Sequence, residues 1–329
     1  MSPRYHALDY LKILLVSGVV LAHAGLMSNH IPQWGYLVGN GLLRATVPTF
    51  ALLTGAGLFH TMRRGRLRRW SAAMLSVYLI WCVIYAPIWL RDITGPAQLA
   101  QRLFFGPMHL WYLAAMLLAT AILALVLHGA ADAASGRRRV IATVLVTGLA
   151  GSFLQFAGFF GWLRLEGDEI RNGLFLIYPF AGLGYLLADW VERHGRDALP
   201  SAKVLWLGLA IVIALRLGEA MLDMAVFGTS LGTVPEFPPL AYGFSALLFL
   251  AFIRLEVPAP FVDLSTISAV TYLMHMGFIL LLLHFGIRNP WLMFWGGLLL
   301  PMLIAVALPR LPWLGRRRAA PAPVPRQPE

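Results

Sequence analysis

The sequence predicts an all-α polytopic membrane protein, a bundle of about ten transmembrane helices with both termini in the cytoplasm. The first indication is composition, because 59% of the 329 residues are hydrophobic and only 12% are charged, against about 25% in a typical soluble protein. The second is that apolar runs of about 20 residues, enough to cross a bilayer, recur along the chain. The third is that basic residues concentrate in alternate links.

The apolar runs predict ten spans joined by short links. The first run, residues 10–27, also resembles a secretory signal peptide cut after Ala24. The spans that follow need no cleavable signal, so we expect a retained helix. No link is long enough for a second soluble domain. The predicted spans are 8–27, 37–60, 71–90, 109–128, 139–160, 172–190, 203–224, 239–254, 265–284 and 291–309.

The basic residues set the expected orientation. The links after the second, fourth and sixth spans contain RRGRLRR, SGRRR and ERHGRDALPSAK. The links after the odd-numbered spans hold only Arg91, Arg102, Arg164, Arg171 and Arg288. Basic loops stay on the cytoplasmic side, so we expect both termini and the even-numbered links to face the cytoplasm. The net charge of +11 therefore indicates orientation in the membrane rather than nucleic-acid binding.

The remaining sequence features predict the domains of the chain and exclude several kinds of site. We expect residues 1–310 to form one transmembrane domain and residues 311–329, rich in Arg, Pro and Ala, to be a disordered cytoplasmic tail. The single cysteine, Cys82, lies in an apolar run, which excludes an intramolecular disulfide. Because no zinc-spaced Cys/His set and no Walker loop occurs, we expect neither a metal site nor ATP-driven transport. Abundant Arg and Ala with few Lys indicate a high-GC bacterium and hence its inner membrane.

Three ionisable residues share one face of the first predicted span. Helical residues are about 100° apart, so His23 lies within roughly 20° of Lys12, and Asp9 lies roughly 60° from Lys12. At about 1.5 Å per residue, His23 is roughly 16 Å above Lys12, beyond the bilayer midplane. Ionisable groups inside a span are costly and are usually functional. Two structural alternatives stay open: Lys12 as an anchor that pairs with Asp9, and His23 as a hydrogen bond between helices.

Further polar residues occur in the second and fourth predicted spans. Arg44 lies toward the outer end of the second span, at a depth comparable with His23, and Thr54 lies further along that span. His109 and Trp111 begin the fourth span at its outer boundary. A structural ion pair for Arg44 and an interfacial aromatic anchor at His109 and Trp111 are the alternatives to a functional role.

The seventh and ninth predicted spans each carry a pair of polar residues. Tyr272 and His275 are three residues apart and share one face of the ninth span near the midplane. Arg216 and Glu219 are also three residues apart, so they can neutralise each other inside the seventh span, and for this pair we favour a structural role.

Four motifs in this order resemble the acyltransferase family 3 membrane proteins, and the resemblance covers most of the chain. The first is Lys12-x10-His23 inside LDYLKILLVSGVVLAHA, with lysine where arginine is commoner. The second is RATVPTFALLTG, where Thr54 stands for the usual serine and Ala51 for an aromatic residue. HLWYL and YLMH complete the set. The proline often found after the arginine cluster is absent, and the pattern around LDYLK resembles the glucan-succinylating branch.

The resemblance implies an integral membrane O-acyltransferase. Such an enzyme moves an acyl group, acetyl or succinyl, from cytoplasmic acyl-CoA to a hydroxyl of an envelope polysaccharide, glucan or lipid-linked saccharide. Acyl-CoA is then a co-substrate, and no cofactor is permanently bound. The expected partners are acyl-CoA, the saccharide and the lipid bilayer, without nucleic acid. The acyl group, the acceptor, the face on which it is modified and the oligomeric state all stay open.

Acyl-CoA carries phosphates at one end and a thioester at the end of a long arm, so the two ends of the first span have different expected roles. Lys12 with Asp9, and the nearby Arg63, Arg64 and Arg66, would hold the phosphates at the inner surface.

His23 would take the proton of the attacking hydroxyl as a general base. Arg44 or His109 would stabilise the oxyanion that forms on the thioester carbonyl. We expect substrate contacts from four further side chains, Trp111, Tyr272, His275 and Thr54.

Two other functions are compatible with the residues. The first is a transporter or flippase for a lipid-linked saccharide or small anion, with Arg44, Arg216 and Glu219 lining the path. The second is a non-catalytic membrane subunit of an envelope assembly. An acyltransferase consumes acyl-CoA in detergent, whereas a transporter needs a sealed membrane and a gradient.

Overall fold

The computed structural model describes residues 5–29, 33–164, 167–229, 235–236 and 238–307, and over these residues it contains helices and no strand. Nine of the described helical segments are long and apolar enough to cross a membrane. A shorter apolar helix, Ala241–Arg254, lies at the predicted eighth span. The prediction of an all-α polytopic membrane protein is therefore confirmed. The predicted tail, 311–329, lies outside the described residues.

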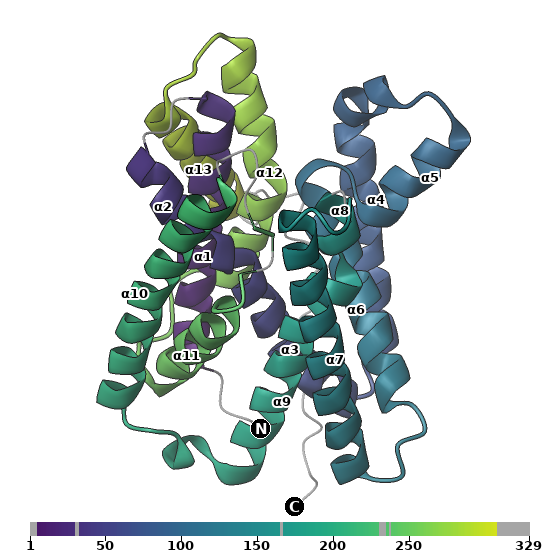
Figure 1. Cartoon of the computed structure of the whole chain (residues 1–329), viewed down its shortest axis with the longest axis vertical. Coiled ribbons are helices and arrows are strands. Elements are labelled where there is room, and N and C mark those ends of the chain that lie inside the picture. Colours follow the sequence, from purple (N-terminus) through teal and green to yellow (C-terminus); the bar gives the residue numbers. More distant parts are fainter. Residues whose placement is uncertain (1–4, 30–32, 165–166, 230–234, 237, 308–329) are drawn as a thin grey trace, which may run out of the picture.

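Figure 1 shows the arrangement of the helices. The helices that correspond to predicted spans are α1 (His6–Ser28), α2 (Gln33–Gly41) with η1 (Leu43–Ala45) and α3 (Thr46–Arg63), α4 (Leu67–Trp89), α6 (Trp111–Leu127), α7 (Ala133–Phe159), η4 (Gly173–Ile177) with α9 (Tyr178–His194), α10 (Ala202–Phe227), α11 (Ala241–Arg254), α12 (Leu264–His284) and α13 (Pro290–Ala307). The short helices of the links are η2 (Leu90–Asp92), α5 (Pro96–Phe105), η3 (Met108–Leu110), α8 (Gly167–Ile170) and η5 (Arg196–Ala198).

The second predicted span is divided in the structure. α2 ends at Gly41, the short helix η1 carries Arg44, and α3 starts at Thr46. Glycine is a poor helix former, and the stretch GNG leads into the break. Pro48 lies in the first turn of α3, where its missing N–H costs no hydrogen bond. The break therefore follows from the local sequence, and it places a charged residue on a turn of 3-10 helix inside the bundle.

The links alternate between two ends of the bundle. In Figure 1 the α6–α7 and α9–α10 links lie at the lower end, and the α12–α13 link lies at the upper end. The arginine-rich stretches lie at these two lower links and in the helix turns next to them. We therefore expect the lower end to face the cytoplasm. α1 packs against α3, α12 and α13, so its polar face looks into the bundle rather than into lipid.

α3 and α9 approach so closely that their backbones touch. A Cβ atom built on Gly55 would lie 1.9 Å from the carbonyl oxygen of Ala181, and one on Gly184 would lie 1.9 Å from that of Leu52. Small residues allow this close approach between membrane helices, where dispersion contacts replace the hydrophobic effect. Gly57 lies in the same helix, but a Cβ there has no atom within 4 Å.

We predict that Gly55→Ala and Gly184→Ala each destabilise the bundle, by about 1–3 kcal/mol, because the added methyl group forces α3 and α9 apart. Gly57→Ala is the matched control, since its methyl group enters open space. Thermal unfolding of the detergent-solubilised protein measures the difference. Equal unfolding temperatures for the Gly55 and Gly57 variants would contradict the close helix contact.

Candidate active site

A cavity of about 430 Å³ lies at the end of the bundle opposite the arginine-rich links. This volume is typical of small-molecule sites. Its walls come from the last turns of α1, the start of α2, the α2–α3 break and the starts of α6 and α13. The polar and aromatic residues that line it are His23, Trp34, Asn40, Arg44, Thr46, Trp111, Arg171, Glu236 and Trp291.

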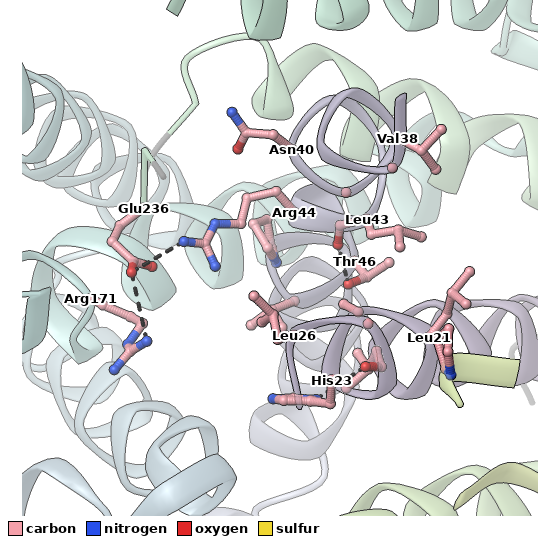
Figure 2. Close-up of a pocket in the computed structure, with 18 of the residues that line it drawn as sticks. Leu21, His23, Leu26, Val38, Asn40, Leu43, Arg44, Thr46, Arg171 and Glu236 are labelled. Carbon is pink, nitrogen blue, oxygen red and sulfur yellow. Dashed lines mark hydrogen bonds and ion pairs between the residues drawn. The ribbon is translucent and has the colours of Figure 1, made fainter. Parts of the chain in front are cut away.

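His23 forms part of the cavity wall. Its Nδ1 atom lies 3.0 Å from the carbonyl oxygen of Val19, one turn earlier in α1. The same Nδ1 lies 3.2 Å from Nε2 of His275 on α12. The ring thus makes both contacts through Nδ1, and among the described residues no hydrogen bond reaches its Nε2. Figure 2 shows His23 on the wall of the space that Arg44, Arg171 and Glu236 also face.

Arg44 lies on the break between α2 and α3, and it is held by the segment that precedes α11. Its Nε donates to the carbonyl oxygen of Pro235 at 3.1 Å, and its Nη2 lies 3.2 Å from the Glu236 carboxylate. Arg171 shares this carboxylate at 3.6 Å and lies over the Trp111 ring, 5.2 Å from its centroid. Two guanidinium groups thus share one carboxylate at the cavity wall (Figure 2), and the local charge is positive.

Two of these residues were missed by the sequence prediction. Arg171 was considered only as an isolated arginine of an outer link, and Glu236 was not considered. Arg44, Arg171 and Glu236 are far apart in the sequence, so no spacing rule connects them. The expected ion pair of Arg44 is present, yet the same side chain lines the cavity.

His109, Tyr272 and His275 form a buried polar cluster behind His23. Nε2 of His109 lies 3.2 Å from the carbonyl oxygen of Leu273, and the Tyr272 hydroxyl donates to the carbonyl oxygen of His109. The His109 and His275 rings are 5.0 Å apart between centroids. His109 is 4% exposed and His275 is fully buried.

The structure places these three predicted site residues behind the cavity wall. In the described structure none of the three residues lines the cavity. The oxyanion role of His109 and the substrate contacts of Tyr272 and His275 stay predictions, since Nδ1 of His109 is buried and has no hydrogen-bond partner among the described residues. Thr54 also lies off the cavity wall, and its hydroxyl donates to the Phe50 carbonyl at 2.9 Å.

At the N-terminal end of α1, Lys12 pairs with Asp9, as the sequence indicated. The Lys12 ammonium donates to Asp9 at 3.0 Å and to the Ser265 hydroxyl of α12 at 2.7 Å. The Ser265 hydroxyl donates in turn to Asp9 at 2.6 Å. The Ser268 hydroxyl donates to the Lys12 carbonyl at 3.1 Å. This end of α1 is therefore fastened to α12.

The arginines expected beside Lys12 lie apart from it. Arg63 pairs with Glu192 at 2.8 Å, and Arg64 and Arg66 are exposed in the α3–α4 link. No ion pair or hydrogen bond in the described part of the chain joins them to Lys12. The structure also describes no group of three His, Cys, Asp or Glu residues able to hold a metal ion.

Arg216 and Glu219 form the ion pair that their spacing indicated. Arg216 is 1% exposed and also donates to the Asn40 carbonyl at 2.7 Å. The Glu219 carboxylate accepts from the backbone N–H of Leu240 at 3.4 Å. The pair thus ties α10 to α2 and to the start of α11, which is a structural role.

Comparison with known proteins gives one match. Residues 5–310 match the family model described as an acyltransferase domain. The matched region begins just before α1 and ends just after α13, so it contains every residue that lines the cavity. No curated protein and no solved structure matches the chain.

We predict that Arg216→Met destabilises the protein by about 3–5 kcal/mol, because it leaves the Glu219 carboxylate partly buried without its partner. Arg68→Met, at an exposed position of α4, is the control and should change stability little. The unfolding temperature in detergent measures both. An Arg216 variant as stable as the Arg68 variant would refute the structural role.

Proposed function

Because the chain belongs to the acyltransferase family 3 of integral membrane proteins, we propose that it is an acyl-CoA-dependent O-acyltransferase. Membership of the family makes it a membrane acyltransferase. Our proposal adds the donor, cytoplasmic acyl-CoA carrying an acetyl or succinyl group, and the acceptor, a hydroxyl of an envelope polysaccharide, glucan or lipid-linked saccharide. It also places the protein in a bacterial inner membrane.

One observation carries the proposal: His23 lies on the wall of a substrate-sized cavity, and its hydrogen bonds to the described residues are made through Nδ1. In the proposed step the acceptor oxygen attacks the thioester carbonyl carbon while its proton passes to Nε2 of His23. The tetrahedral intermediate then collapses, the C–S bond breaks, and the departing CoA sulfur takes that proton. His23 ends the cycle as it began.

Arg44 is the better-placed group for the oxyanion. A guanidinium has five N–H donors, and the contacts of Arg44 with Pro235 and Glu236 use only part of them. The remaining donors are available to an oxygen that becomes negative in the cavity. Arg171 adds positive charge on the same wall, from its position over Trp111. We therefore propose Arg44, rather than His109, as the group that stabilises the oxyanion.

The donor would approach from the cytoplasmic end of α1. Two of the three N–H donors of Lys12 are used by Asp9 and Ser265, which leaves one for a phosphate oxygen. Asp9 then supports Lys12 rather than contacting the donor, because its charge repels phosphate. The exposed Arg63, Arg64 and Arg66 would contribute at longer range. Lys12 and His23 are roughly 16 Å apart along α1, a distance that the extended pantetheine arm can cover.

The acceptor would approach from the opposite end. Trp34, Trp111 and Trp291 line the cavity, and Trp34 and Trp291 are exposed at its mouth. Tryptophan combines a flat apolar face with one N–H donor, and the apolar faces of sugar rings stack on such surfaces. The aromatic lining therefore supports a saccharide acceptor. Transport has less support, since the carboxylate of Glu219, its main candidate, belongs to the structural ion pair with Arg216.

We predict that His23→Ala lowers thiol release from acetyl-CoA or succinyl-CoA, with crude envelope saccharide as acceptor, by about 10²–10⁴-fold. Free thiol is followed with a chromogenic disulfide in detergent. His284→Ala, which removes an exposed histidine at the end of α12, is the control and should keep full activity. Full activity of a folded His23→Ala variant would show that His23 is not the general base. Background release from every variant and the wild type would favour transport.

A second prediction separates the two roles of Lys12. Lys12→Met should lower stability, because it removes the cation that neutralises the buried Asp9 carboxylate. The double variant Asp9→Asn/Lys12→Met should regain stability. Its KM for acyl-CoA should stay about tenfold above wild type, as expected when one hydrogen bond to a charged group is lost. If the stable double variant kept the wild-type KM for acyl-CoA, Lys12 would fasten α1 to α12 and would not bind the donor.

A further inference from the structure

His23 of α1 and His275 of α12 are in contact, and the groups around them determine which ring donates the hydrogen bond. We infer that His275 is a positioning residue: it accepts a hydrogen bond from Nδ1 of His23 and so keeps Nε2 of His23 unprotonated and turned toward the cavity. The inference rests on the proposed role of His23 as the base, and it goes beyond that role because His275 itself lies off the cavity wall.

The proton on His275 is located by its neighbour. Nδ1 of His275 lies 2.7 Å from the carbonyl oxygen of Tyr272. A carbonyl can only accept, so this nitrogen carries the hydrogen. A neutral imidazole has one N–H, which leaves a lone pair on Nε2. His275 is neutral because it is fully buried and no ion pair in the described structure involves it.

The proton on His23 follows from the same reasoning. Nδ1 of His23 faces two acceptors, the lone pair of His275 at 3.2 Å and the carbonyl oxygen of Val19 at 3.0 Å. A hydrogen on Nδ1 can be shared between these two acceptors, whereas a lone pair on Nδ1 would face the lone pairs of both. His23 is therefore the Nδ1–H tautomer, and its Nε2 is free to accept a proton. With the Val19 carbonyl as its one acceptor, the His23 ring could still turn. The second acceptor, Nε2 of His275, fixes the orientation of the ring.

His275 is itself held on a rigid support. The hydroxyl of Tyr85 donates to the Leu273 carbonyl at 2.9 Å and accepts from the N–H of Gly277 at 3.0 Å. Tyr272 is fastened to the backbone at His109, and the His109 ring packs against that of His275. α4, η3 and α12 thus together set the position of His275, and through it that of the His23 ring.

The contact also gains strength during the reaction. When His23 takes the proton at Nε2 it becomes an imidazolium, and its Nδ1–H bond to the neutral Nε2 of His275 becomes charge-assisted. Such a bond favours the transition state over the ground state, so it acts on kcat rather than on KM. Without His275 the Val19 carbonyl still faces Nδ1, but the His23 ring can turn, and its Nε2 is no longer held toward the acceptor hydroxyl.

Two substitutions at position 275 separate positioning from packing. In His275→Gln the side-chain amide oxygen can reach the place of Nε2 and still accept from His23. In His275→Asn the shorter amide can bond the Tyr272 carbonyl but falls short of His23. We expect His275→Gln to keep kcat within about tenfold of wild type and His275→Asn to lose about 10²-fold, a loss typical of a misplaced catalytic group. The KM values for acyl-CoA and saccharide should change little in both.

A purely structural role gives a different pattern. Both variants would then lose activity in proportion to their lowered unfolding temperatures, and an equal loss of kcat would overturn the inference. If His23→Ala itself kept full activity, the proposed base would fail first, so the two failures are distinguishable. Should either variant not fold, ¹⁵N NMR of the wild-type histidines, assigned with His23→Ala, reads the tautomer directly. Protonated Nδ1 is expected for His23, and protonated Nε2 would overturn the inference.

Discussion

In the bilayer core no water is available to a polar side chain, so every such group must find its partner within the protein. α1 meets this constraint through α12. At one end Lys12 and Asp9 share the Ser265 hydroxyl, and at the other His23 contacts His275. These two polar contacts fasten one face of α1 at two depths. They set the height and rotation of His23, and the cavity forms on the side of that histidine left without a protein partner in the described structure.

The α2–α3 break depends on the same constraint. A break in a membrane helix is tolerated where it lines a cavity or is buried in protein. Here the break lines the cavity, and it turns Arg44 toward the same space as His23. The close contact of α3 with α9 at Gly55 and Gly184 holds α3 in place below the break. A base and a cation are thus brought together by two helices, each positioned by its own neighbours.

Local sequence determines part of this site. Apolar runs locate the spans, and helical periodicity places Lys12 and His23 on one face of α1, because both follow from residues near one another in the chain. Periodicity does not say what a face packs against. α1 and α4 cover the helix faces that carry His109, Tyr272 and His275, so these side chains are buried. Glu236 lies beside Arg44 through a tertiary contact, for which the local sequence carries no signal.

The most direct test of the account is a cryo-EM structure with a thioether analogue of acetyl-CoA, which cannot be cleaved. If acyl transfer occurs in the cavity, the acyl end will lie within hydrogen-bond reach of Nε2 of His23 and of Arg44, with the phosphates at the Lys12 end of α1. An acyl end outside the cavity, or bound only on the cytoplasmic side of Lys12, would contradict delivery of the donor along α1 to His23.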